Sequence, residues 1–399
     1  MTKPISLSLH IAFFVWAIFS LSLIVEIPLR YLPILEILPF ALLLLSFILG
    51  YRFNRSLVIY SAILFILIYA YPFLSDQLNN QQQTLILNSL IIFLVVNVSL
   101  LCFYHERGIF TLIGISRFVL IFAQVGGFFW LIRTQPAYWQ QLISQTIFPA
   151  LEIKLAFFEQ SSLLLILISI ILISSSYLTR ANPFRSAIFV SMFIVLYAIT
   201  LPATEILSFS ALISYALLLP LLTLMSESYR MAFIDELTSL PGRRALNEAM
   251  DKLGNQYVIA MLDVDHFKKF NDRYGHDAGD DVLQLLGSRL KSIKGAGKPF
   301  RYGGEEFAIL FSGTTLKEAN EHLQALREVI ANKKFALRKQ ERRRKNSRAR
   351  KQKQRYVSVT ISIGYAEYND KFTSPSAVLK AADKALYRAK KKGRNCVSR

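Results

Sequence analysis

The chain is poor in cysteine: its 399 residues include only Cys102 and Cys396. Two cysteines so far apart build no framework of disulfides, and neither stands in the spacing of a zinc site. The sequence therefore lacks the marks of a disulfide-rich secreted domain and of a thiolate metal centre. It fits a reducing compartment and a chemistry that does not use thiols.

Acidic residues are also scarce, with 27 Asp and Glu against 46 Lys and Arg and a net charge of +19. A run of 13 basic residues lies between Lys333 and Arg355, where Glu341 is the one acid. Because such a run is too charged to pack, we interpret it as a flexible, hairpin-like insertion. We expect it to contact anionic lipid headgroups. An RNA contact and a merely solvated loop are the alternatives.

Charge is rarest in the first 225 residues, which hold 10 basic and 7 acidic side chains. Eight apolar runs of membrane-spanning length lie there, at about 7–27, 34–50, 56–74, 84–103, 110–132, 162–179, 186–203 and 206–225. Runs of this length predict transmembrane helices. Residues 1–225 are thus predicted to form a multi-span α-helical membrane domain that anchors the chain in the lipid bilayer and senses a signal.

Basic residues near the ends of the spans set the orientation in the membrane. With the N-terminus in the cytoplasm, seven lie inside: Lys3, Arg52, Arg55, Arg107, Arg180, Arg185 and Arg230. Three lie outside: Arg30, Arg133 and Lys154. We therefore expect a multi-pass membrane protein. A short helical linker, 226–234, would lead to a cytoplasmic domain. Arg117, at the start of the fifth span, is a functional candidate or a snorkelling side chain.

Carboxylates stand at two bends in the last part of the chain. Asp263 follows the apolar strand Tyr257–Leu262, and Gly303-Gly304 marks a hairpin turn that carries Glu305 and Glu306. If the two strands are neighbours, Asp263 and Glu305 converge on one hard cation. Mg²⁺ prefers one or two carboxylates together with substrate phosphates. The pattern predicts metal-assisted phosphoryl transfer.

Six sequence blocks follow one another from Asp235 to the end: DELTSLPGRR, LDVDHFKKFND, GHDAGD, RYGGEEF, VTISIGYA and ADKALYRAKKKGRN. In this order they resemble the GGDEF domain of diguanylate cyclases. The resemblance implies an α/β, palm-like nucleotidyl cyclase fold over 235–399, with a central sheet of about five strands between helices. It also implies condensation of two GTP molecules into cyclic di-GMP with release of pyrophosphate.

The resemblance assigns roles to individual residues. Metal ligands are Asp263, the carbonyl of Val264, Glu305 and the adjacent Glu306, with two Mg²⁺ per active site and Mn²⁺ as an alternative ion. Glu305 and Lys268 are the implied catalytic residues. Phosphate-binding residues are Phe267, Lys268, Lys390 and Arg394, and guanine is read by Asn271 and Asp280.

The residues by themselves leave plainer interpretations open. Asn271 is typical of a helix end, Asp280 of the N-cap of a helix over 281–290, and Asp265 of another helix cap. Glu305, Glu306 and the basic side chains are also typical of a solvated surface. His266 and His276 are interpreted as structural.

One departure from the family concerns feedback. Lys294 and Gly297 stand where the family has the Arg and Asp of its product-inhibition site, so we expect that site to be absent. Closing a cyclic dinucleotide requires two facing sites, which predicts a homodimer. No DNA partner is expected. A catalytically silent nucleotide receptor and a transporter with a regulatory domain remain as alternatives.

Overall fold

The computed structural model describes residues 3–24, 28–75, 78–104, 106–145, 159–179, 182–202, 205–336 and 356–399. The chain divides into two compact units, Met1–Ser226 and Glu227–Arg399. Most of the basic run at Lys333–Arg355 lies outside the described residues, as does Lys154.

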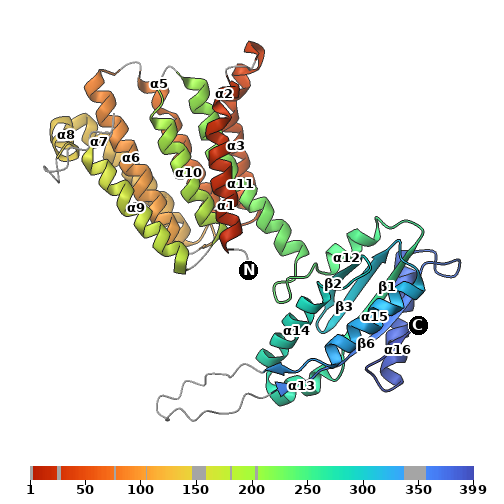
Figure 1. Ribbon diagram of the computed structural model, residues 1–399. Coiled ribbons are helices and arrows are strands. Elements are labelled where there is room, and N and C mark those ends of the chain that lie inside the picture. The colour runs from red at the N-terminus through yellow and green to blue at the C-terminus, as the bar shows by residue number, and fades with distance from the viewer. Residues whose placement is uncertain are drawn as a thin grey trace, which may run out of the picture. The chain divides into compact units, whose positions relative to one another are not determined.

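The first unit is helical (Figure 1). Its described elements are α1 (Lys3–Phe19), α2 (Leu21–Ile24), η1 (Leu29–Tyr31), α3 (Leu32–Arg52), α4 (Ser56–Tyr69), α5 (Tyr71–Ser75), α6 (Asn80–Phe103), α7 (Leu112–Thr134), α8 (Pro136–Ile143), α9 (Gln160–Thr179), α10 (Pro183–Ile199) and α11 (Ile206–Phe233). The eight apolar runs of the sequence fall on α1, α3, α4, α6, α7, α9, α10 and α11.

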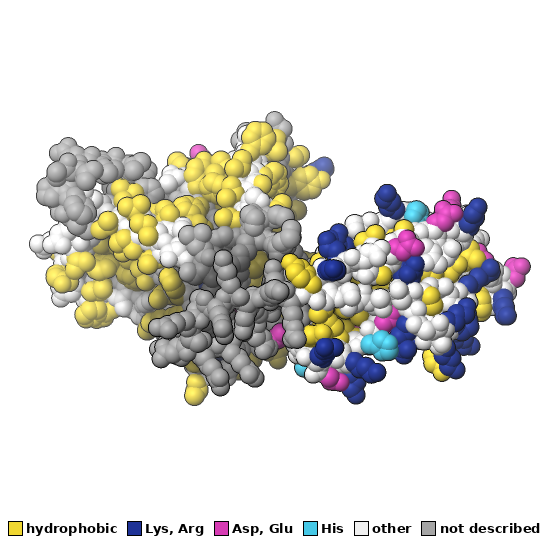
Figure 2. Space-filling view, turned by 60° about the horizontal axis from the view of Figure 1, so that its bottom comes forward, with side chains coloured by type: hydrophobic (Ala, Val, Ile, Leu, Met, Phe, Trp, Pro, Cys, Tyr) yellow, Lys and Arg dark blue, Asp and Glu magenta, His cyan; other side chains and the backbone are white. Residues whose placement is uncertain are grey.

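In the described part of the chain, five apolar stretches are long enough to cross a membrane: Leu32–Arg52, Ser56–Leu74, Asn80–Phe103, Leu112–Thr134 and Ile206–Phe233. Three shorter apolar helices lie at Leu7–Leu23, Gln160–Ser175 and Pro183–Ile199. Large hydrophobic side chains also face outward, with Phe19 70% and Phe129 68% exposed. Figure 2 shows hydrophobic side chains over the surface of the first unit and many Lys and Arg side chains over that of the second.

Several buried polar side chains of the first unit have partners within the bundle. Ser89 donates to the Leu85 carbonyl at 2.7 Å, one turn back along the same helix. The His10 imidazole links three helices, because Nδ1 lies 2.9 Å from Ser186 Oγ and Nε2 lies 3.2 Å from Thr223 Oγ1. Such pairing is required where no water is available. The bundle therefore holds more buried polar groups than the apolar runs suggested.

The second unit is built on a five-stranded sheet with the order β2-β3-β1-β6-β7. Its strands are β1 (Tyr257–Val264), β2 (Gly297–Gly303), β3 (Glu306–Ser312), β6 (Ile361–Glu367) and β7 (Val397–Ser398), and a separate pair comprises β4 (Phe335–Ala336) and β5 (Tyr356–Val357). Its helices are α12 (Arg243–Met250), α13 (Phe267–Tyr274), α14 (His276–Leu290), α15 (Leu316–Ala331) and α16 (Pro375–Lys391). This agrees with the expected five-stranded α/β fold.

The alternation of β1 divides the core into two layers. Val258, Ala260 and Leu262 belong to the cluster that includes residues of α14 and α15, whereas Ile259 and Met261 pack with α12 and α16. Asp263 continues the second series, so its carboxylate emerges on the α16 face.

One sequence-based boundary was wrong, that of the helix in the GHDAGD region. Between Tyr356 and Ile363 the chain contributes to two sheets: β5 pairs with β4 at the base of the basic insertion, and β6 joins the main sheet. The helix expected at 281–290 begins at His276, because the residues of GHDAGD already form its first turns.

Candidate active site

Three carboxylates meet where β1 ends and the β2–β3 hairpin turns. β1 and β3 are antiparallel neighbours, and the register places Asp263 opposite Glu306. Glu305 lies in the turn beside Gly304, which has φ +47°. This left-handed backbone conformation favours glycine, which has no side chain to clash in a tight turn. The strands are neighbours as the sequence analysis required, with Glu306 directly opposite Asp263 and Glu305 one residue before it.

Lys390 joins this cluster from α16. Its ammonium Nζ lies 2.8 Å from Asp263 Oδ2, and the Asp263 side chain is 7% exposed. Burial raises the pKa of Asp263, and the Lys390 charge opposes that rise. Burial also raises the pKa of both Glu305 and Glu306, followed in each by repulsion from Asp263. The three carboxylates repel one another and have only the Lys390 ammonium beside them, so the site favours additional positive charge.

The cluster fits a divalent ion shared with phosphates better than an ion held by protein alone. Among the described residues, no three His, Cys, Asp or Glu side chains are arranged to hold a metal ion by themselves. Mg²⁺ typically takes one or two carboxylates and completes its shell with water and substrate phosphates. Asp263, Glu305 and Glu306 supply oxygen donors of that kind. Val264 is the buried last residue of β1.

Asn271 of α13 lies against Gly279 of α14, and the exposed Asp280 is the next residue along α14. A Cβ atom at Gly279 would overlap the Asn271 side chain, so glycine permits the close approach of α13 and α14. The side-chain oxygen of Asn271 is buried and has no hydrogen-bond partner within the described residues. A buried acceptor without a partner costs free energy, so the Asn271 oxygen is a candidate to accept a hydrogen bond from a bound ligand.

The cap interpretations of this region were wrong. Asp280 is the fifth residue of α14, and the residue before the helix is Gly275. Asp265 does not cap α13, because its carboxylate accepts from Thr360 Oγ1 at 2.7 Å, Ser362 Oγ at 2.6 Å and Asn395 N at 2.9 Å. It thus fixes the segment after α16 against the end of β1. No sequence signal showed these distant partners.

The remaining candidates surround the same end of the sheet. Phe267 is buried and Lys268 exposed at the first two positions of α13. Arg394 follows α16 just beyond Gly393, and its charge acts on Asp263. A cavity of about 430 Å³ lies beside Glu306 and is lined by Asp383, Lys384, Tyr387 and Lys390 among others. The site therefore combines acidic and basic groups around an open hollow.

The family comparison matches this architecture. The family described as "Diguanylate cyclase, GGDEF domain" matches residues 232–396. This part of the chain is a GGDEF domain.

Curated relatives are similar over the same region. Response regulator PleD of Caulobacter vibrioides is 33% identical over 181 residues, which are 43% of this chain and 37% of the relative. Diguanylate cyclase DgcP of Pseudomonas aeruginosa is 34% identical over 43% of this chain and 24% of its own length. Diguanylate cyclase VdcA of Vibrio cholerae is 35% identical over 43% of this chain and 48% of its own length. The chain spans less than half the length of each of these relatives.

Among solved structures, the coiled coil and GGDEF domain of DgcB from Caulobacter crescentus, in complex with c-di-GMP, is 29% identical. The match covers 44% of this chain and 88% of that one, with a TM-score of 0.38.

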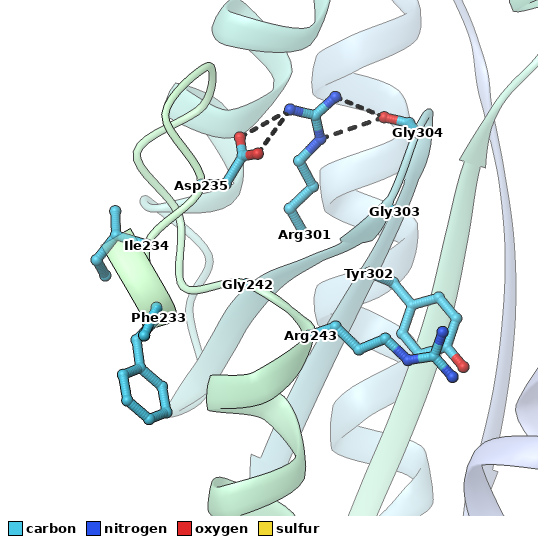
Figure 3. Close-up of a pocket in the computed structure, with 10 residues that line it drawn as sticks. Phe233, Ile234, Asp235, Gly242, Arg243, Arg301, Tyr302, Gly303 and Gly304 are labelled. Carbon is cyan, nitrogen blue, oxygen red and sulfur yellow. Dashed lines mark hydrogen bonds and ion pairs between the residues drawn. The ribbon is translucent and has the colours of Figure 1, made fainter. Parts of the chain in front are cut away.

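In this GGDEF domain the hairpin is braced by a residue that sequence reasoning did not select. Arg301 Nη1 lies 2.8 Å from both carboxylate oxygens of Asp235, while its Nη2 donates to the Gly304 carbonyl at 2.7 Å (Figure 3). The Arg301 backbone N–H also donates to Pro241 O at 2.8 Å. Burial, the largest single influence, raises the pKa of Asp235. The hydrogen bonds from Thr238 and the pairing with Arg301 together outweigh it, so the pKa of Asp235 is lowered.

The brace connects the end of α11 to the GGDEF turn. Asp235 follows α11 by two residues, and Gly304 is the residue directly before Glu305. A cavity of about 410 Å³ lies here, bordered by Phe233, Ile234, Arg243 and the hairpin (Figure 3). The sequence could have pointed to this contact through the acid of the DELT block, Asp235, and the base of the RYGG block, Arg301. These two residues are 66 positions apart.

We predict that Arg301→Lys loosens the hairpin. Lysine keeps the charge but cannot make the two-sided contact with Asp235 and Gly304 O. Hydrogen exchange at the amides of residues 303–306 should accelerate by about tenfold or more, because a charge-assisted hydrogen bond contributes about 1.5–3 kcal/mol. Arg244→Lys is the matched control, since Arg244 is exposed. Unchanged exchange in Arg301→Lys would show that the brace does not hold the turn.

Proposed function

We propose that the protein is a membrane-anchored diguanylate cyclase that condenses two GTP molecules into cyclic di-GMP and two pyrophosphates. The observation that carries this proposal is the convergence of Asp263, Glu305, Glu306 and Lys390 on one end of the sheet of a GGDEF domain. A silent nucleotide receptor has no need for such a concentration of mutually repelling carboxylates. The alternative of a weak, contact-signalling receptor is therefore less favoured.

The reaction forms two phosphodiester bonds. Each 3′-oxygen attacks the α-phosphorus of the other nucleotide, the bond from that phosphorus to the pyrophosphate oxygen breaks, and the 3′-hydroxyl proton is released. Divalent ions, proposed as two Mg²⁺ with Mn²⁺ as a substitute, would supply neutralisation of the phosphate charge. Asp263, Glu305, Glu306 and the Val264 carbonyl would hold them.

The basic residues of the chain orient the phosphates. Lys390 already lies against the carboxylate cluster, where it can contact a phosphate brought to Asp263. Lys268 lies at the start of α13, five residues after Asp263, and Arg394 lies just after α16, four residues after Lys390. The Phe267 and Lys268 amides at the first turn of α13 supply further donors for an anion.

Guanine selection is assigned to Asn271 and Asp280. The carboxylate of Asp280 can accept from the N1–H and N2–H₂ donors of guanine together. The buried oxygen of Asn271 supplies another acceptor, supported by its lack of a partner among the described residues. Adenine lacks this pair of donors, so its binding would leave the acceptors unsatisfied.

Two copies of the chain would face each other, because each nucleotide is both nucleophile and electrophile. A homodimer with two-fold symmetry is the simplest arrangement. The apolar helices of the first unit would anchor it in the bacterial inner membrane with the GGDEF domain in the cytoplasm, where GTP is present. The basic run Lys333–Arg355 would contact anionic headgroups of the same membrane.

Glu305→Ala should abolish product formation while leaving the domain folded, because Glu305 lies in a turn. The expected loss is at least about 100-fold, since a metal ion in this role contributes several kcal/mol. The assay incubates the full-length protein with GTP and Mg²⁺ and separates nucleotides by chromatography. Glu321→Ala, an exposed acid on α15, should retain activity. Full activity of Glu305→Ala would refute the metal assignment.

Asp280→Asn should raise the GTP dissociation constant by about 5- to 150-fold, corresponding to about 1–3 kcal/mol for a buried polar group left unsatisfied. Gly279→Ala is expected to act on the same step, because its methyl group displaces Asn271. Nucleotide titration with GTP and ATP distinguishes selectivity from stability. If Asp280→Asn binds GTP normally and still rejects ATP, Asp280 has no role in reading the base.

Product inhibition should be competitive only. Lys294 is exposed in the turn before β2, and it lacks the planar fork of arginine. At Gly297 a Cβ atom would lie 2.8 Å from the Phe311 ring and 3.1 Å from Ile293, so the packing there leaves no room for an aspartate. Cyclic di-GMP is titrated into the assay at saturating GTP. Strong inhibition that survives high GTP would show that another surface has taken over feedback.

A further inference from the structure

The segment after α16 turns the chain through three successive residues in the left-handed backbone conformation. Gly393, Arg394 and Asn395 have φ values of +106°, +67° and +44°. Residues other than glycine rarely adopt this conformation, because the Cβ atom then approaches the following carbonyl oxygen. Two such residues in a row persist only where their surroundings hold them. The contacts that hold this turn therefore determine where Arg394 lies.

The two ends of the turn are fixed by backbone hydrogen bonds. On one side, the Arg394 N–H donates to the Ala389 carbonyl of α16 at 3.2 Å. On the other side, the Ile363 N–H of β6 donates to the Cys396 carbonyl at 3.0 Å, next to the start of β7. Neither bond involves Asn395, the residue between these two ends, so the middle of the turn depends on other contacts.

The Asn395 N–H donates to the buried carboxylate of Asp265. It lies 2.9 Å from Oδ2, and Asp265 is 7% exposed. The hydroxyl of Thr360 donates to the same oxygen at 2.7 Å, and that of Ser362 donates to Oδ1 at 2.6 Å. A carboxylate only accepts hydrogen bonds, and bonds to it are stronger than those between neutral groups. The two hydroxyls therefore fix the carboxylate in the orientation that holds the turn.

Arg327 of α15 contacts the same residue from the solvent side. Its Nη1 donates to Asn395 O at 3.4 Å and to Asn395 Oδ1 at 3.3 Å, and both contacts are exposed. The bond to Asp265 is shorter and lies inside the domain. Asp265 is thus the principal partner of Asn395.

Two aspartates of one segment therefore hold two basic residues of the candidate active site. Asp263 pairs directly with Lys390 at 2.8 Å, whereas Asp265 holds the residue that follows Arg394. The positive charge of Arg394 also acts on Asp263, so its guanidinium lies on the side of the carboxylate cluster. The end of β1 and the residue after it thus position both cations.

We propose that Asp265 is a positioning residue for phosphate binding: its carboxylate holds the Asn395 amide and so keeps the Arg394 guanidinium beside the carboxylate cluster. This role rests on the proposed function, in which Arg394 contacts a phosphate of GTP. Asp265 itself is assigned no contact with the substrate. Loss of its carboxylate should weaken the binding of GTP through the phosphates and leave the binding of guanine unaffected.

The test uses the full-length protein and initial rates of cyclic di-GMP formation from GTP and Mg²⁺. Asp265→Leu keeps the approximate size of the side chain and removes both acceptor oxygens. KM for GTP should rise at least about tenfold, because an arginine–phosphate contact is a charge-assisted hydrogen bond. Guanosine, added as a competitive inhibitor, has no phosphate. Its inhibition constant should therefore stay within about twofold of the parent value.

Asp265→Asn is the conservative control. Its one carbonyl oxygen can accept from Thr360 Oγ1 and from the Asn395 N–H, while its NH₂ group donates to Ser362 Oγ. KM for GTP should therefore stay close to that of the parent. Hydrogen exchange at the Asn395 amide should be slow in the parent and in Asp265→Asn, and faster in Asp265→Leu.

A double-mutant cycle shows whether Asp265 acts through Arg394. Adding Asp265→Leu to Arg394→Ala should change KM by less than about twofold, because the contact that Asp265 positions is already absent. If Asp265→Leu does not fold, Thr360→Val replaces it, since valine has nearly the shape of threonine and lacks the hydroxyl that fixes Oδ2. Thr360→Val should raise KM for GTP by about 2- to 5-fold, with guanosine inhibition unchanged.

Equal rises in KM for GTP and in the guanosine inhibition constant would overturn the proposal, because the substitution would then distort the whole site. Additive effects in the double mutant would overturn it too, since Asp265 would act independently of Arg394. A parent protein that binds GTP without forming cyclic di-GMP would overturn the proposed function alone, and dissociation constants of GTP and guanosine would then decide the role of Asp265. A parent protein that binds no GTP would overturn both.

Discussion

The ion pair between Asp263 and Lys390 is the contact that organises the candidate active site of the GGDEF domain. It joins the central strand β1 to the last helix, and it places one positive charge beside three carboxylates whose pKa values are all raised, first by burial. Without the ammonium, burial of Asp263 would favour its neutral form. The Lys390 charge opposes the rise in the pKa of Asp263. In the proposed reaction the same ammonium would lie close to where a phosphate arrives.

A second set of contacts positions the hairpin from the opposite side. Arg301 connects the Gly304 carbonyl to Asp235, and Asp235 follows the end of α11 by two residues. α11 is a continuous helix from Ile206 to Phe233. Lys390 on α16 thus holds Asp263. The turn that carries Glu305 is held through Arg301 by Asp235, in the segment that enters the domain.

Local patterns in the sequence predicted the strand before Asp263, the Gly-Gly hairpin and the apolar helices, because each follows from alternation, turn residues or the length of an apolar run. Contacts between distant residues were not predictable in this way. Asp265 resembled a helix cap until its partners Thr360 and Ser362 were found almost 100 residues later, on the neighbouring segment. Asp280 was interpreted as the N-cap of a helix over 281–290, whereas that helix begins at His276. Gly279 instead lies inside α14, where its missing side chain makes room for Asn271.

The two units manage buried charge differently. In the GGDEF domain, the buried carboxylate of Asp263 lies against an ammonium, and the buried Asp265 accepts three hydrogen bonds from the chain. In the helical unit, hydroxyl groups bond to carbonyls one turn away, which satisfies polarity without charge. Arg117 lies over the Tyr104 ring and Arg185 donates to the Tyr104 carbonyl, so the buried guanidiniums of this unit also lie against groups of the chain.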